Sequence, residues 1–168
     1  MGSRGDQVAA FIDAINQRSA KRILEMGTKD SSFLVELIGQ VDGGPVIELF
    51  CTECPNQAFD SEVLAAGERT STEFQLAKYS GSDSEINDTI LELFSPVQLD
   101  AAFISSSSSS EALLTSMLVC HESLKLNGVL GVCSNLLLDS EMVRAVSSFR
   151  DLLGDAYHEI SDHVFAKA

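Results

Sequence analysis

The stretch Ala20-Lys-Arg-Ile-Leu-Glu-Met-Gly-Thr28 decides the fold of this chain. Its residues Arg22 to Met26 are predicted to form a short strand, and Gly27 interrupts that strand. Apolar side chains then recur at helical spacing from Phe33 to Val41, until Asp42-Gly-Gly-Pro45 turns the chain. The stretch therefore opens a unit of strand, loop and helix.

The same alternation continues along the rest of the chain. Apolar strands are separated by roughly 10 to 15 residues of helical spacing, which favours right-handed crossovers and a parallel sheet covered on both faces. The expected fold class is α/β, a doubly wound, mostly parallel Rossmann-like sheet with helices on both faces. The first helix is expected at Val8 to Ile15, and the further strands at Val46 to Phe50, Phe74 to Tyr79, Leu99 to Ile104 and Val129 to Cys133.

The C-terminal segment follows a different pattern. Two extended stretches, Ala156 to Ile160 and Val164 to Ala166, are separated only by Ser161-Asp-His163, which is too short for a crossover helix. An antiparallel hairpin at one edge of the sheet is therefore expected. Residues 1–168 are expected to form one domain.

The composition limits the classes of binding partner that are expected. The 168 residues carry 11 Lys and Arg against 25 Asp and Glu, a formal net charge of −14, so a nucleic-acid partner is not expected. No apolar run reaches the roughly 20 residues of a membrane helix, and the N-terminus lacks the apolar core of a signal peptide. A cytoplasmic acidic protein with reduced cysteines and no membrane contact is expected.

Five segments carry a resemblance to a known family. They are Gln7 to Ile15, Ala20 to Thr28, Leu99-Asp-Ala-Ala-Phe-Ile104, Leu124-Lys-Leu-Asn-Gly-Val-Leu130 and His163-Val-Phe-Ala-Lys167. In this order they resemble successive segments of class I S-adenosylmethionine-dependent methyltransferases, specifically the catechol O-methyltransferase-like family. The resemblance implies a methyltransferase fold, S-adenosylmethionine as cofactor and a methyl acceptor.

The residues also indicate where a ligand would bind. In an open α/β sheet, ligands bind beyond the carboxyl ends of the strands, where the strand order reverses. Gly27 would let the backbone approach a ligand closely, and the N–H groups that open the next helix suit a carboxylate. The resemblance places S-adenosylmethionine there, surrounded by Glu25, Gly27, Thr28, Ser32, Glu53, Asp83 and Ser105.

The chain departs from the family's cofactor motifs. The resemblance implies an acidic residue at the end of the second strand. An alignment without a gap places Phe50 at that position, although Glu53 lies one turn away. Asp83 is displaced by one residue in a segment similar to Gly-Asp-Ala. Lys29-Asp-Ser31 replaces the second glycine of the first loop. Weak cofactor binding is therefore expected.

The metal motif is also altered. The resemblance implies a magnesium-type ion held by an Asp after the fourth strand and an Asp-Asn pair after the fifth. Those positions match Ser105, Ser134 and Asn135, so only the amide ligand is kept. A hard cation without a carboxylate ligand would be poorly held, and no metal is expected.

The sequence identifies no catalytic base. His121 continues an apolar helical stripe and is expected to be packed or half-buried, whereas His158 and His163, in the terminal hairpin, are expected at the surface. Metal-independent transfer needs only in-line positioning when the acceptor is already a good nucleophile, so an enzyme stays compatible with this pattern.

Two further features leave alternatives open. Ser105 to Ser110 is a solvated loop that caps the next helix, or part of a ligand site at the strand end. Cys51-Thr-Glu-Cys54-Pro55 is expected between a strand and a helix, where a redox pair would have lowered thiol pKa values, although Glu53 opposes a thiolate. Incidental reduced thiols and thiols that line the cofactor pocket are the other interpretations.

Two main functions follow. The first is methyl transfer from S-adenosylmethionine to a small-molecule or peptide acceptor, without a metal. The second is a catalytically silent methyltransferase-like domain used for binding or regulation, and thiol redox chemistry is the least favoured. A homodimer is left open as the assembly.

Overall fold

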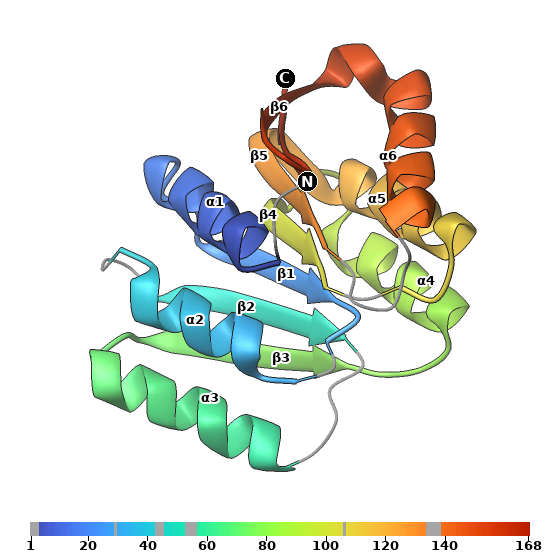
Figure 1. Ribbon diagram of the computed structural model, residues 1–168. Coiled ribbons are helices and arrows are strands. Elements are labelled where there is room, and N and C mark those ends of the chain that lie inside the picture. The colour runs from blue at the N-terminus through green and yellow to red at the C-terminus, as the bar shows by residue number, and fades with distance from the viewer. Residues whose placement is uncertain (1–3, 29, 43–45, 53–56, 106, 134–138) are drawn as a thin grey trace.

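The computed structural model describes residues 4–28, 30–42, 46–52, 57–105, 107–133 and 139–168 (Figure 1). The strands of these residues form one sheet in the order β3-β2-β1-β4-β5-β7-β6. The first five strands run parallel and β7 runs antiparallel to both of its neighbours, which confirms the expected fold class and hairpin. The strands are β1 Arg22–Met26, β2 Ile47–Thr52, β3 Phe74–Tyr79, β4 Leu99–Ile104, β5 Leu124–Val132, β6 Tyr157–Ser161 and β7 Val164–Lys167.

Helices cover both faces of the sheet (Figure 1). One apolar core lies between the sheet and α1, α2 and α3, and a second lies between the sheet and α4, α5 and α6. A short 3-10 helix, Gly154–Ala156, leads into β6. The helices are α1 Arg4–Gln17, α2 Ser32–Gln40, α3 Gln57–Thr70, α4 Asp83–Phe94, α5 Ser110–Ser123 and α6 Asp139–Leu153.

Neighbouring residues of the central strand β4 pack in opposite cores. Ala101 and Phe103 of β4 belong to the core under α1 to α3, whereas Ala102 and Ile104 belong to the core under α4 to α6. Successive side chains of a strand point to opposite faces, so a strand covered on both sides must be apolar throughout. This is why β4 is continuously apolar from Ala101 to Ile104 rather than alternating.

The order of the strands reverses between β1 and β4. The chain passes from β1 outward through β2 to β3, then returns to place β4 against the other side of β1. The loops that leave the carboxyl ends of β1 and β4 therefore diverge to opposite sides and leave room between them. This is the position at which open α/β sheets bind ligands.

Two parallel strands extend beyond the ranges that the sequence predicts. β2 continues past Phe50 to Thr52, because its parallel register with β3 extends to the pair Thr52 and Tyr79. β5 begins at Leu124 rather than Val129, and an irregularity in its pairing with β4 follows that first residue. Asn127 has a left-handed φ of 64° there. Because of this local break, the apolar runs of the sequence did not indicate the longer strand.

The prediction that His163 lies at the surface is wrong. This residue occupies the turn between β6 and β7 with a left-handed φ of 59°, and it is only 5% exposed. Its Nδ1 is 3.2 Å from the side-chain nitrogen of Gln7, a buried residue of α1. Helix α1 therefore covers the turn. The sequence pattern did not indicate this contact, because the two residues are 156 positions apart. His158 is exposed and His121 is half-buried, as predicted.

Candidate cofactor-binding site

The end of β1 is held against the end of β2 by backbone geometry. Gly27 has a φ of +74°, in the left-handed region that favours glycine. Its N–H donates to the side-chain hydroxyl oxygen of Thr52 at 2.9 Å, and the N–H of Thr28 donates to the carbonyl of Thr52 at 3.0 Å. The chain therefore turns sharply away from the sheet after Met26 and leaves a space above the strand ends.

A buried acid joins the ends of β1 and β4. Glu25 is 1% exposed, and its carboxyl accepts hydrogen bonds from the hydroxyls of Thr28, at 3.0 Å, and Ser105. Burial raises the pKa of Glu25 from 4.5 to about 7, although these two hydrogen bonds and the charge of Arg4 act to lower it. Glu25 thus links the loop after β1 to Ser105, which lies 80 residues further along the chain than Glu25.

The start of α2 already carries a carboxylate. Asp30 accepts hydrogen bonds from the hydroxyl and, at 2.9 Å, from the backbone N–H of Ser32, and these bonds hold its pKa below the usual range. Ser31, one residue earlier, is buried and donates its hydroxyl to Glu62 of α3. The N-terminus of α2 therefore presents its own acidic group where a ligand carboxylate is expected.

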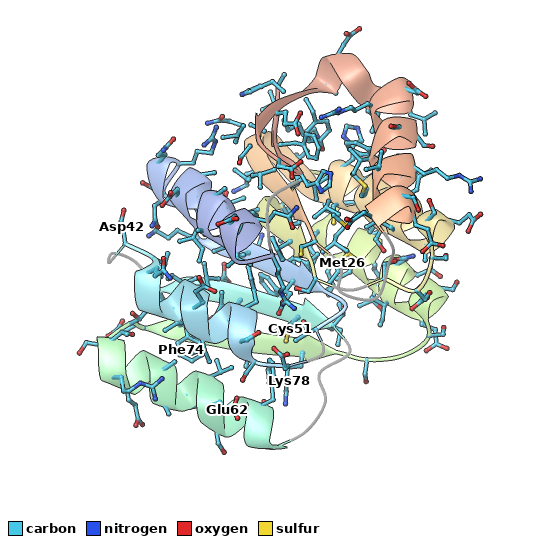
Figure 2. The ribbon with its side chains drawn as sticks, in the orientation of Figure 1. Met26, Asp42, Cys51, Glu62, Phe74 and Lys78 are labelled. Atoms are coloured by element: carbon cyan, nitrogen blue, oxygen red, sulfur yellow. The ribbon has the colours of Figure 1, made fainter. Side chains whose placement is uncertain are left out.

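A cavity of about 590 Å³ opens beside Gly27 and Thr52, within the range of small-molecule sites. Its walls come from the ends of β1 and β2, the first turns of α4, the loop after β4 and one side of α5. Met26, labelled in Figure 2, contributes from the strand end on the side of α4 and α5. The lining residues are Met26, Gly27, Thr52, Asp83, Ser84, Ile86, Asn87, Asp88, Leu91, Ser107, Ser108, Ala112, Thr115, Ser116 and Val119.

The structure brings together five of the seven predicted cofactor residues. Gly27 and Asp83 line the cavity, and the linked group of Glu25, Thr28 and Ser105 is buried at the strand ends. Ser32 is exposed at the start of α2 and is not among the lining residues. Glu53 lies outside the described residues.

The serine tract caps the next helix and also borders the cavity. Ser109 caps α5, because its side chain accepts the N–H of Ala112 at 3.0 Å. Ser107 and Ser108, earlier in the same tract, line the cavity. The same tract therefore caps the start of α5 and borders the candidate site.

Sequence reasoning missed most of the two helical walls. On α4 the lining residues Ser84, Asn87 and Leu91 recur at helical spacing, and on α5 Ala112, Ser116 and Val119 do so as well. The signal was a stripe of small and polar side chains beside the apolar stripe that faces the sheet. Such a stripe also describes an ordinary solvated helix face, so it indicated no site before the fold was known.

The Cys-x-x-Cys segment does not have the expected placement. Cys51 lies within β2 rather than in the loop after it, and it is fully buried in the core under α1 to α3 (Figure 2). Cys54 lies outside the described residues. Cys51, Cys120 and Cys133 are thiols rather than disulfides. The thiol of Cys51 therefore packs in this core and is not presented at the start of a helix.

Among the described residues, no three His, Cys, Asp or Glu side chains are grouped so that they could hold a metal ion. In the same part of the chain, every helix is too short or too polar to cross a membrane.

Solved O-methyltransferase structures have a similar arrangement of strands and helices. No protein-family model and no curated protein sequence matches the chain. The O-methyltransferase TomG from Streptomyces achromogenes, solved with S-adenosylmethionine, superposes with a TM-score of 0.66 at 14% identity, over 100% of this chain and 81% of that one. An O-methyltransferase from Bacillus cereus, solved with S-adenosylhomocysteine, gives 0.63 at 12% identity, over 100% and 82%. The chain therefore has the class I fold of S-adenosylmethionine-dependent O-methyltransferases.

Proposed function

We propose that this chain binds S-adenosylmethionine in the cavity at the ends of β1 and β2 and transfers its methyl group to a hydroxyl of a small-molecule or peptide acceptor. The observation that carries this proposal is the position of the cavity, at the reversal of strand order, with Gly27 in its wall. The structural neighbours, solved with S-adenosylmethionine and its demethylated product, support it.

The residues around the cavity would position the cofactor. The left-handed turn at Gly27 brings the backbone close to the ligand space without a side chain in the way. Glu25 fixes the loops after β1 and β4 relative to each other through Thr28 and Ser105. The bound cofactor supplies a methyl group activated on a sulfonium, and the rate then depends on holding an acceptor oxygen in line with it.

We infer that the reaction proceeds without a metal. The resemblance implied Ser105 as a ligand position, but the hydroxyl of Ser105 is neutral and is donated to Glu25. A hydroxyl used in this way contributes no charge against the cost of dehydrating a hard cation. The other two implied positions, Ser134 and Asn135, lie outside the described residues.

Binding should be weak because of Asp30. The carboxylate of Asp30 holds the first N–H of α2, so the methionine carboxylate of a cofactor meets a like charge at the helix start. We expect a dissociation constant on the order of 10 to 100 μM.

Calorimetric titration with S-adenosylmethionine tests the proposal. Gly27→Val should abolish the binding, because valine is strained at a φ of +74° and its side chain enters the cavity. Gly39→Val is the matched control, since Gly39 lies on α2 with nothing within 4 Å of an added Cβ. Absence of binding by the unmodified chain at millimolar cofactor contradicts the proposal directly.

A silent binding domain is the second candidate, and the placement of Asp30 favours it. A domain used for binding alone has no need to hold the cofactor's methionine end in a reactive orientation. Transfer of label from methyl-tritiated cofactor to a panel of hydroxyl-bearing compounds and peptides separates the two candidates. Binding without any transfer supports the silent domain.

A further inference from the structure

A smaller cavity lies between the end of α6 and the hairpin of β6 and β7. We call it the hairpin cavity and define it by Phe149 and Leu153 of α6, Tyr157 and Glu159 of β6, and Phe165 of β7. Its volume is about 140 Å³. It shares no described lining residue with the larger cavity at the strand ends, so it is a separate site.

Aromatic rings form the inner wall of the hairpin cavity. Phe149 and Phe165 are buried, and the ring of Tyr157 lies 5.1 Å from that of Phe149, at an angle of 56°. The hydroxyl of Tyr157 is 3.0 Å from Nδ1 of His121, so the polar end of this side chain already has a partner. The wall therefore offers ring surface, which packs well against another aromatic ring.

The volume of the hairpin cavity limits the size of a ligand. Gly154 of the 3-10 helix lies in the wall without a side chain, and a Cβ added there would meet nothing within 4 Å. A protein cavity of about 150 Å³ lined by apolar side chains holds one benzene molecule. A cavity of about 140 Å³ therefore has room for one six-membered ring and not for two.

The rim of the hairpin cavity carries one donor and one acceptor. Arg150 of α6 donates to the carboxylate of Glu159, and its guanidinium lies 5.4 Å from the centre of the Phe165 ring. The same carboxylate accepts the backbone N–H of His163 at 3.4 Å, which holds it beside the hairpin turn. The side chains of Arg150 and Glu159 are 49% and 39% exposed. A pair this exposed contributes little stability, so a ligand can share both partners, and their opposite charges favour a neutral ligand.

We propose that the hairpin cavity binds a neutral molecule with one aromatic ring and one hydroxyl group. The ring packs against Phe149, Tyr157 and Phe165. The hydroxyl lies at the rim, where it donates to Glu159 and accepts from Arg150. This inference does not rest on the proposed function, because the cofactor is assigned to the other cavity.

Titration with phenol, followed by NMR of the tyrosine rings, tests the inference. The chain has two tyrosines and no tryptophan. Tyr157 lines the hairpin cavity, whereas Tyr79 ends β3, at the opposite edge of the sheet (Figure 1). Phenol should shift the signal of Tyr157 with a dissociation constant on the order of 1 mM and leave that of Tyr79 in place. Neither tyrosine lines the larger cavity, so phenol bound only there leaves Tyr157 unshifted.

Two tryptophan variants show where the phenol binds. Leu153→Trp should remove the shift of Tyr157, because the larger side chain takes up the space of the ligand. Leu152→Trp is the matched control, since Leu152 precedes it on α6, is 62% exposed and is not among the lining residues. This control should keep the shift.

Anisole tests the role of the hydroxyl. It has a methyl group in place of the hydroxyl proton, so it cannot donate to Glu159 and should bind about 10-fold more weakly than phenol. Glu159→Ala should remove most of this difference, because the acceptor is then absent for both compounds.

Three results overturn the inference. The first is a signal of Tyr157 that stays in place at tens of millimolar phenol. The second is a shift of Tyr157 that persists in a folded Leu153→Trp variant, since Tyr157 then responds to binding elsewhere. The third is equal affinity for phenol and anisole, which shows that the rim does not recognise the hydroxyl. This last comparison uses the unmodified chain, so it decides the matter even if Leu153→Trp does not fold.

Discussion

Glu25 is an acid in a place from which water is excluded. In the unfolded chain its pKa is about 4.5, whereas burial raises its pKa in the folded chain to about 7. Folding therefore takes up a proton between these two pH values. The stability linked to this proton is fully present below about pH 4.5 and is lost as the pH rises through about 7. Arg4 and Asp30 are the charged groups that act on Glu25, in opposite directions.

Glu25→Gln should remove that pH dependence. The amide keeps the shape of the acid and an acceptor oxygen for one of the two hydroxyls. Between pH 4.5 and 7 the unmodified chain should lose about 3 kcal/mol of unfolding free energy relative to the variant. Urea unfolding at several pH values measures the unfolding free energy of the unmodified chain and of the variant. If this free energy changes with pH in the same way in both proteins, Glu25 is ionised in the folded state.

Asp30→Asn should strengthen cofactor binding. The substitution keeps a side chain that can cap α2 but removes the like charge from the helix start. An interaction of this kind contributes about 0.3 to 1 kcal/mol, so the dissociation constant for S-adenosylmethionine should fall by a factor of about 2 to 5. Calorimetry measures it, and Asp42→Asn, at the other end of α2, serves as the control. A weaker affinity in Asp30→Asn would mean that the ligand carboxylate binds elsewhere.

Single residues of the site were predictable only where local chemistry decides them. A glycine after an apolar strand indicated Gly27, and a segment similar to Gly-Asp-Ala indicated Asp83. The bond between Glu25 and Ser105 was not predictable, because it joins strand ends 80 residues apart. Ser31, the N-cap of α2, and Ser32, its first residue, show the same limit, since a step of one residue, about 100° around the helix, separates the buried Ser31 from the exposed Ser32.

At the scale of elements, contact between α1 and the sheet depends on a glycine of β5. An added Cβ at Gly131 would lie 2.7 Å from the ring of Phe103 and 2.8 Å from that of Phe11. These two rings pack edge to face at 5.1 Å, and Phe33 stacks on Phe103 at 4.6 Å, so none can move freely. The helix can approach the strand this closely only above a residue without a side chain.

Gly131→Ala should therefore lower the unfolding free energy by about 1 to 3 kcal/mol. The same change at Gly39, which is exposed on α2 with open space around it, should raise it by about 0.5 kcal/mol through the higher helix propensity of alanine. Chemical denaturation compares the two variants. Equal effects would mean that the rings move aside for the methyl group.

The type and order of elements followed from apolar periodicity, whereas some of their ends did not. The termination of β2 depends on its partner strand, which supplies pairs as far as Tyr79. The burial of His163 depends on a helix from the far end of the chain. Both are tertiary effects, and apolar spacing within one segment carries no information about them.

At the scale of the whole molecule, two cores share one sheet. Cys51 is fully buried in the core under α1 to α3, and Cys120 is fully buried in the core under α4 to α6. Burial also raises the pKa of Cys120 to about 12, so little thiolate exists in the folded state. The two thiols therefore report separately on the two faces of the sheet.

Both thiols should resist iodoacetamide in the native protein, because each is inaccessible. In increasing urea they should become labelled at the same concentration, since strands common to both cores make the two faces unfold together. Peptide mass spectrometry follows each cysteine. Labelling of one at lower urea than the other would show that one helical layer detaches while the sheet persists.

The pairing of β5 has a consequence for how the chain is made. β5 is bordered by β4 on one side and by β7 on the other, and β7 follows it only after α6 and β6. A ribosome therefore releases β5 well before the strand that covers its outer edge. During that interval an apolar edge with unsatisfied backbone groups is open to other chains, which is the condition that favours aggregation. Slow translation through α6 would prolong this exposure, and chaperone protection is needed most at that stage of synthesis.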